Sequence, residues 1–184
     1  MSRISQLVDS YSKYISVPWR DDAAAAQRVI FCIYNETDEL RLRAKVVEFE
    51  LATKEHGHGW ETFDLTDSFA QWLSNEEYKE EYFKSPKLLN DQFSEFVSYV
   101  SGQIKDWIDS KNIANNTVVA IMGIGSLFGF MKIKDLVDEI SKYVPGRLLI
   151  FFPGSYENNN YRLLDGYDGW NYLAVPITPD KQNY

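Results

Sequence analysis

The chain has 184 residues, of which 45% are hydrophobic and 15% aromatic, so it has the length of one ordinary globular domain and can bury a substantial core. Its 27 acidic and 19 basic residues give a net charge of −8, which would repel a duplex phosphate backbone and argues against direct nucleic-acid binding. No apolar run approaches the roughly 20 residues that a membrane span requires, and the N-terminus lacks the basic-then-apolar pattern of a signal peptide. We therefore expect a single cytoplasmic domain over residues 1–184.

The first half of the chain is predicted to alternate between helix and strand. Residues 4–15 carry apolar side chains at helical spacing and indicate a short amphipathic helix. Residues 28–34 (RVIFCIY) are almost uniformly apolar, which is typical of a central parallel strand covered on both faces. A helix is predicted after Asn35 and ends at Gly57. Its side expected to face the core is an apolar stripe made of Leu40, Ala44, Val47 and Leu51, with Val46 and Phe49 widening it.

The middle of the chain predicts a weaker strand and a long helix. Residues 60–65 alternate in polarity, which indicates the strand, and a short helix is expected to follow. Residues 74–85 are rich in charge and are interpreted as a solvated connection or a surface helix. The Ser-Pro pair at 85–86 suits the N-cap and first turn of the long helix, which ends at residues 112–116.

A further strand, a glycine turn and a helix follow. Residues 117–122 predict the strand, 123–130 (GIGSLFGF) the turn, and 147–152 another fully apolar strand. The helix between them is predicted to bury Ile133, Leu136, Val137, Ile140 and Val144. Alternating strands and helices favour an α/β fold, a three-layer sandwich with a mostly parallel sheet of about five strands.

The C-terminal part of the sequence changes character. Residues 153–177 contain Pro-Gly, Asp-Gly and Asn-rich turn signals and are interpreted as a long loop and a hairpin-like edge, with extended pieces at 161–164 and 172–176. The tail at 178–184 is expected to fray.

The glycine turn invites comparison with phosphate-binding loops. It lacks the lysine of a Walker A loop, and the third glycine of a dinucleotide-binding fingerprint would fall at Phe128. A nucleophile elbow centred on Ser126 would need glycines two residues to either side, where none stands. Two interpretations stay open: a structural turn, or a helix N-terminus that holds a small anion at Gly123, Gly125 and Ser126.

No residue set predicts catalysis, a metal or a cofactor. Cys32 lies inside an apolar strand and is interpreted as a buried thiol. His56 and His58 are each followed by a glycine in a segment interpreted as a helix stop and loop, and they have no third histidine or cysteine to complete a zinc site. Asp165 and Asp168 could hold a hard cation, but each precedes a glycine and is first of all a turn signal. We therefore expect a protein that is not an enzyme.

Aromatic side chains in the C-terminal part indicate either a partner-binding surface or the cover of the sheet edge, and the two interpretations weigh equally. The candidate partner contacts are Tyr156, Arg162, Tyr167 and Trp170. Ligand sites of parallel sheets lie at the carboxyl ends of the strands. Residues 123–127 and 153–162 are therefore expected to line any site.

Two segments resemble the BrxB family of BREX (bacteriophage exclusion) defence systems. They are GIGSLF at 123–128, after an apolar strand, and FFPGSYENNNYRLLDGYDGWNYLAVPI at 151–177, after the next. The first two predicted α/β units also fit, so the resemblance covers roughly residues 5–177, and the F-P-G-x-Y segment with the following YRLL is its most specific part.

The resemblance implies a cytoplasmic, non-enzymatic component that acts by binding other BREX proteins. These include a large ATPase, a PglX-type methyltransferase and a PglZ-type, alkaline-phosphatase-like protein, of which the last is the expected partner. The family offers no established catalytic residues to carry over. The alternative function is a nucleotide- or anion-sensing α/β domain with a degenerate glycine loop at residues 123–127.

Overall fold

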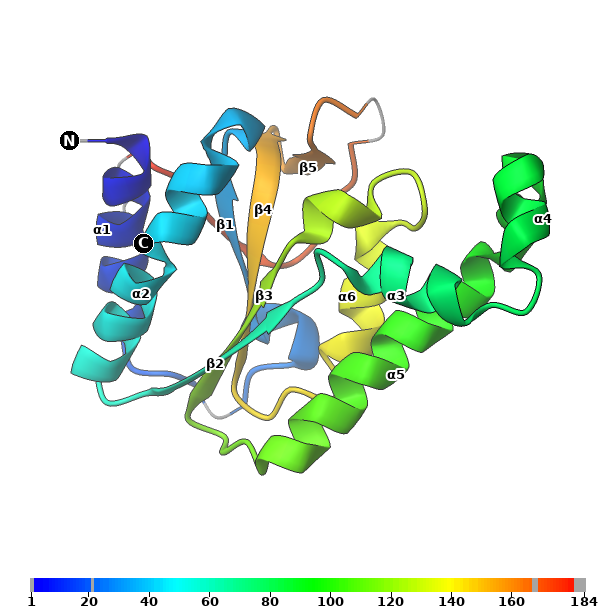
Figure 1. The fold of residues 1–184 in the computed structure, drawn as a ribbon. Coiled ribbons are helices and arrows are strands. Elements are labelled where there is room, and N and C mark those ends of the chain that lie inside the picture. The colour runs from blue at the N-terminus through cyan, green and yellow to red at the C-terminus, as the bar shows by residue number, and fades with distance from the viewer. Residues whose placement is uncertain (1, 21, 167–168, 181–184) are drawn as a thin grey trace.

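A mostly parallel sheet runs through the middle of the protein, between two layers of helices (Figure 1). The computed structural model describes residues 2–20, 22–166 and 169–180. The strand order is β2-β3-β4-β1-β6, with every neighbouring pair in this path parallel, and β5 pairs antiparallel with the outer end of β4. The strands are β1 (Val29–Tyr34), β2 (Gly59–Asp64), β3 (Thr117–Met122), β4 (Arg147–Glu157), β5 (Asn160–Leu163) and β6 (Val175–Ile177).

The helices divide between the two faces of the sheet. Figure 1 shows α1 and α2 together on one face and α3, α5 and α6 on the other. Their bounds are α1 (Arg3–Ile15), α2 (Glu39–Glu55), α3 (Ser68–Asn75), α4 (Lys79–Lys84), α5 (Phe93–Lys111) and α6 (Ile133–Ile140). The predicted three-layer α/β sandwich is confirmed. Among the described residues, none of these helices has the length and apolar character of a membrane span.

The central strands explain why the sequence runs so uniformly apolar there. Every residue of β1, β3 and the first half of β4 is buried, because both faces of these strands are covered by helices. Alternate residues serve different cores: Phe31 packs towards α5 and α6, while Cys32 packs towards α1 and α2. Cys32 is fully buried, which confirms the predicted buried thiol, and this burial raises its pKa well above the usual value.

Helix α2 corrects one sequence prediction. Its stripe of Leu40, Ala44, Val47 and Leu51 faces solvent rather than the core. The buried side of α2 is formed by Leu42, Phe49, Ala52 and Thr53. Apolar residues on both sides of the helix offered two possible stripes, and the choice between them depends on where α1 and the sheet lie.

Two helix starts also differ from prediction. The Ser-Pro pair at 85–86 opens a 3-10 turn, Pro86–Gln92, and α5 begins only at Phe93. The helix expected directly after the glycine turn begins at Ile133, and its predicted buried side is confirmed. Short-range signals for a helix start do not distinguish a 3-10 turn from an α-helix.

The C-terminal part forms a different edge from the predicted one. The hairpin is made by β4 and β5, turning through Asn158 and Asn159, which both have positive φ. The second extended piece does not join that hairpin: β6 runs parallel to β1 as the other edge of the main sheet. Periodicity identifies an extended segment but not the strand with which it pairs.

Candidate functional site

The glycine turn lies at the carboxyl edge of the sheet, as predicted, and its first glycine is required by packing. Gly123 follows β3 with φ +78°, a conformation that side-chain-bearing residues rarely adopt. A Cβ there would stand 2.6 Å from Oγ1 of Thr66 and 2.7 Å from Oδ1 of Asp64. The glycine therefore lets the end of β3 pass close to the end of β2.

The remainder of the turn is a compact 3-10 segment, Ile124–Leu127, rather than the predicted start of an α-helix. The N–H of Ser126 donates to the carbonyl of Gly123 at 3.0 Å, so this amide is already used within the turn. Gly125 lies against the ring of Pro153, with 3.4 Å between its ideal Cβ position and Cγ. These features account for the glycines without a ligand, and anion binding at Gly123, Gly125 and Ser126 stays a prediction.

At the same edge of the sheet, a polar network links α2 to the end of β2. Arg43 donates from Nε to Glu39 at 2.7 Å, from Nη1 to Asp64 at 2.8 Å and from Nη2 to Thr66 at 2.7 Å. The hydroxyl of Tyr34 also donates to Glu39. Burial raises the pKa of Asp64, but hydrogen bonds from Arg43 and Thr66 outweigh it and hold that pKa below its usual value. The network anchors α2 to the end of β2.

The C-terminal aromatic residues cover the core at this edge. Trp170 packs edge-on against Phe31 at 5.8 Å between ring centroids and against Phe152 at 6.1 Å. Tyr161 is fully buried, and its hydroxyl donates to the carbonyl of Ala174 at 2.8 Å. The structural role that the sequence left open therefore applies to Tyr161 and Trp170.

The candidate partner contacts are now placed in part. Arg162 is exposed on β5, and Tyr156 is half-buried with its hydroxyl donating to Asn159 at 3.0 Å. Trp170 is half-buried, as described above, and Tyr167 lies outside the described residues. The described candidates share the carboxyl edge around the β4–β5 hairpin, and among them Arg162 is exposed whereas Tyr156 and Trp170 are half-buried.

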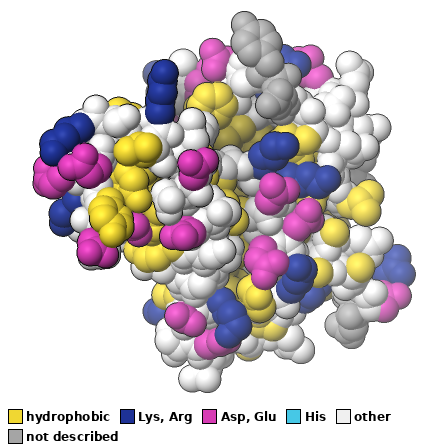
Figure 2. Space-filling model, turned by 90° about the vertical axis from the view of Figure 1, so that its right-hand side faces the viewer, with side chains coloured by type: hydrophobic (Ala, Val, Ile, Leu, Met, Phe, Trp, Pro, Cys, Tyr) yellow, Lys and Arg dark blue, Asp and Glu magenta, His cyan; other side chains and the backbone are white. Residues whose placement is uncertain are grey.

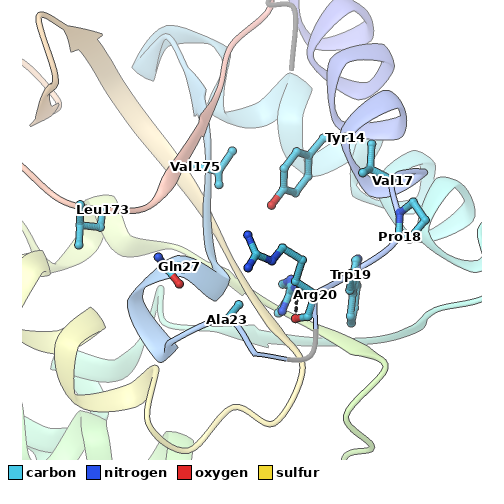
Figure 3. Close-up of a pocket in the computed structure, with 10 residues that line it drawn as sticks. Tyr14, Val17, Pro18, Trp19, Arg20, Ala23, Gln27, Leu173 and Val175 are labelled. Atoms are coloured by element: carbon cyan, nitrogen blue, oxygen red, sulfur yellow. Dashed lines mark hydrogen bonds between the residues drawn. The ribbon is translucent and has the colours of Figure 1, made fainter.

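A cavity of about 340 Å³ lies at the opposite edge of the sheet, where β1, β4 and β6 begin (Figure 3). Tyr14 and Val175 line one side of it, and Ala23 and Gln27 lie across from them. Its other lining residues are Val17, Pro18, Trp19, Arg20, Arg147 and Leu173. Sequence reasoning directed attention to the carboxyl edge and missed this cavity.

Two residues that line the cavity, Arg147 and Trp19, belong to a stack of three side chains. The guanidinium of Arg147 lies 4.8 Å from the centre of the Trp19 ring, and Trp19 stacks on His58 with 3.9 Å between ring centroids. Arg147 is only 7% exposed although it is charged. Burial raises the pKa of Tyr14, and the neighbouring Arg147 opposes that rise. The stack joins segments far apart in the chain, so no motif in the sequence could have revealed it.

An arm formed by α4 and the 3-10 turn Pro86–Gln92 projects from the α5 side of the molecule (Figure 1). Tyr82 and Leu89 are buried within it, whereas Tyr78 and Phe83 are each 61% exposed and Leu88 is 48% exposed. Figure 2 looks at the side on which the arm projects and shows hydrophobic side chains gathered there, with lysine and acidic side chains around them.

The base of the arm is held by packed aromatic rings. Phe69 stacks on Phe130 with 3.9 Å between centroids, and Trp72 lies 5.1 Å from Phe96. The sequence predicted a solvated connection or a surface helix at residues 74–85, because they are densely charged, and α4 is such a helix. The apolar residues within that charged stretch were the signal that could have identified the exposed surface.

Comparison with known proteins identifies one family. The family model "BREX protein BrxB" matches residues 61–176, which include the arm, the glycine turn and the β4–β5 hairpin. No curated protein and no solved structure matches the chain.

Proposed function

The chain belongs to the BrxB family and is thus a component of a BREX phage-defence system, and from this premise we propose that it is a non-enzymatic adaptor that binds another BREX protein. The expected partner is the PglZ-type, alkaline-phosphatase-like protein. The proposal concerns association through a surface rather than chemistry in a cleft.

The projecting arm is the observation that carries this proposal. Tyr78, Phe83 and Leu88 expose large apolar side chains on a segment that projects from the α/β body. Clustered exposed apolar groups of this kind mark interaction surfaces, and aromatic residues are favoured as interface anchors. The packed rings at the base of the arm would hold it ready for a partner, so that little conformational entropy is lost on binding.

The charged residues around the arm indicate what kind of partner surface would complement it. Residues 76–92 contain five acidic residues and three lysines, and the whole chain carries a net charge of −8. A partner with a hydrophobic pocket and a basic rim would complement both features. The second candidate contact consists of the exposed Arg162 on the β4–β5 hairpin, with Tyr156 and Trp170, together with Tyr167, which lies outside the described residues.

Co-expression with each of the other BREX proteins in turn, followed by size-exclusion chromatography with light scattering, tests the adaptor proposal. We expect a stable complex with the PglZ-type protein, and we expect the double variant Tyr78→Ala/Phe83→Ala to weaken it at least tenfold, as loss of interface anchors does. Leu173→Ala, which removes an exposed leucine beside the cavity at the other edge of the sheet, is the matched control.

The outcomes separate the two contact surfaces. If Arg162→Glu weakens the complex and the arm variant does not, the hairpin is the docking site. The adaptor function would be refuted if the wild-type chain elutes separately from every BREX protein with which it is co-expressed.

A further inference from the structure

Helix α2 is apolar on two opposite sides, and the structure uses only one of them. Phe49 and Leu42 are buried against α1 and the sheet. On the other side Leu40 is 81% exposed, Val47 61% and Leu51 54%. Ala44 lies between them and is also exposed, so the four residues form a continuous solvent-facing seam.

The spacing of this seam is that of a coiled coil. Leu40, Ala44, Val47 and Leu51 follow one another at intervals of four, three and four residues, as the a and d positions of a heptad repeat do. Such a seam packs against the equivalent row of another helix. No described segment of this chain covers it.

We propose that the outer side of α2 is a self-association surface, on which α2 of a second copy of this chain packs in the antiparallel direction. With a two-fold axis between Lys45 and Val46, each Leu40 faces the second copy's Leu51. Each Ala44 then faces the second copy's Val47, so a small residue meets a larger one. A parallel pair would instead place alanine opposite alanine and leave a gap in the middle of the seam.

The charges beside the seam favour the same arrangement. Arg41 and Glu48 lie on one flank with side chains 74% and 45% exposed, and in the antiparallel pair each Arg41 faces the second copy's Glu48. On the other flank Arg43 is held within its own chain by Glu39, Asp64 and Thr66, so this flank adds no attractive pair. A parallel pair would place Glu50 opposite Glu55 and add like-charge repulsion. Self-complementary charge therefore indicates a second copy as the occupant.

Arg41 and Glu48 are available for this role. Within one chain Arg41 pairs with Asp38 at 2.6 Å, and Lys45 pairs with Glu48 at 2.6 Å. Arg41 contacts the buried Asp38 through Nη1, and its largely exposed guanidinium keeps other donors for Glu48 of a second copy. The Lys45–Glu48 pair is more exposed and contributes little, so Glu48 can change its partner when a second copy docks.

The size of the seam predicts a weak dimer. About three helical turns on each copy bury less than the roughly 800 Å² per partner of a standard stable interface. Association is therefore expected in the micromolar range and to depend strongly on protein concentration. This inference is independent of the partner proposed for the arm, because α2 and α4 lie on opposite sides of the sheet (Figure 1).

Sedimentation velocity of the purified chain from about 5 to about 500 µM tests the proposal over the range where such interfaces titrate. We expect a monomer–dimer transition that Leu40→Glu/Val47→Glu removes while the circular dichroism spectrum is retained. Leu173→Glu, which places the same charge on another exposed leucine, should leave the transition unchanged. A monomer at every concentration, or a dimer that survives the double variant, would overturn the proposal.

A charge exchange tests the direction of packing. Arg41→Glu is expected to shift the midpoint of the monomer–dimer transition to at least threefold higher concentration. Arg41→Glu/Glu48→Arg should restore the midpoint, because residues 41 and 48 of the two copies then carry opposite charges again.

Mixing A44C protein with V47C protein should form a disulfide between the two chains faster than either variant alone. Preferential cross-linking within A44C alone would overturn the antiparallel arrangement. A third outcome is also decisive. If the wild-type chain is a monomer and the α2 variants lose binding to the BREX partner proposed for the arm, this side of α2 binds that partner instead of a second copy.

Discussion

Helices α2 and α6 carry the same kind of sequence signal and use it in opposite ways. Each has an apolar stripe with helical spacing. The α6 stripe, which includes Leu136 and Ile140, is buried against the sheet, whereas the α2 stripe of Leu40, Ala44, Val47 and Leu51 points into solvent. An apolar stripe thus shows that a helix side is suited to burial, but not whether its own chain or another molecule covers it.

Substitution of one leucine in each stripe gives the largest expected contrast. Leu136→Ala should lower the free energy of unfolding by about 2–5 kcal/mol, because the side chain is buried and leaves a cavity. Leu40→Ala should change it by less than about 0.5 kcal/mol, because the side chain is exposed. Urea unfolding at low protein concentration, where the chain is a monomer, provides the measurement. Equal losses in the two variants would mean that the α2 stripe is covered within the chain.

The turn that leads towards α6 should be the next most sensitive. Gly123→Ala is expected to cost at least about 2 kcal/mol, since it combines a strained positive φ with a clash against Thr66 and Asp64. Gly129→Ala is the matched control, because Gly129 has φ +84° and open space around its Cβ position. It should cost about 1 kcal/mol from strain alone. Thermal unfolding of the two variants side by side would separate packing from strain, and equal losses would contradict the close approach at Gly123.

A buried hydrogen bond holds the inner side of α2 against α1. The hydroxyls of Tyr11 and Thr53 lie 2.6 Å apart, and both residues are fully buried. Tyr11→Phe should lower the free energy of unfolding by about 1 kcal/mol, the usual net contribution of such a bond. Thr53→Ser retains a hydroxyl and should cost less. If the free energy of unfolding is unchanged in Tyr11→Phe, the hydrogen bond between Tyr11 and Thr53 does not stabilise the packing of α2 against α1.

The smallest expected effect is a pH dependence at the end of α2. Burial lowers the pKa of His58 below its usual value of 6.5, so the unfolded chain binds a proton there more readily than the folded one. The associated stability is present above pH 6.5 and is lost as pH falls towards the lower folded-state pKa. His58→Phe, which keeps an aromatic ring against Trp19, should reduce the slope of stability over that range. A His58→Phe variant with the slope of the wild-type chain would contradict this assignment.

Much of the fold could be read from local pattern. The parallel strands β1 and β3 and the buried stripe of α6 follow from uniform apolar runs and helical periodicity, because these patterns reflect burial on both faces or on one side. The sequence also predicts the glycine turn that Gly123 opens, but not the contact of Gly123 with Thr66. For the C-terminal aromatic residues the sequence leaves two interpretations, a structural role and a binding role. The structure shows that Trp170 and Tyr161 pack against the core.

What the sequence by itself determined about this protein is the alternation of strands and helices, the α/β class and the resemblance to the BrxB family. Only the tertiary structure decided which side of α2 is buried, that β6 pairs with β1, and that Arg147, Trp19 and His58 meet at the amino edge of the sheet. The physical reason is the range of the interactions. Periodicity and turn chemistry act over a few residues, whereas the choice of packing partner depends on segments that are distant in the chain and become neighbours only on folding.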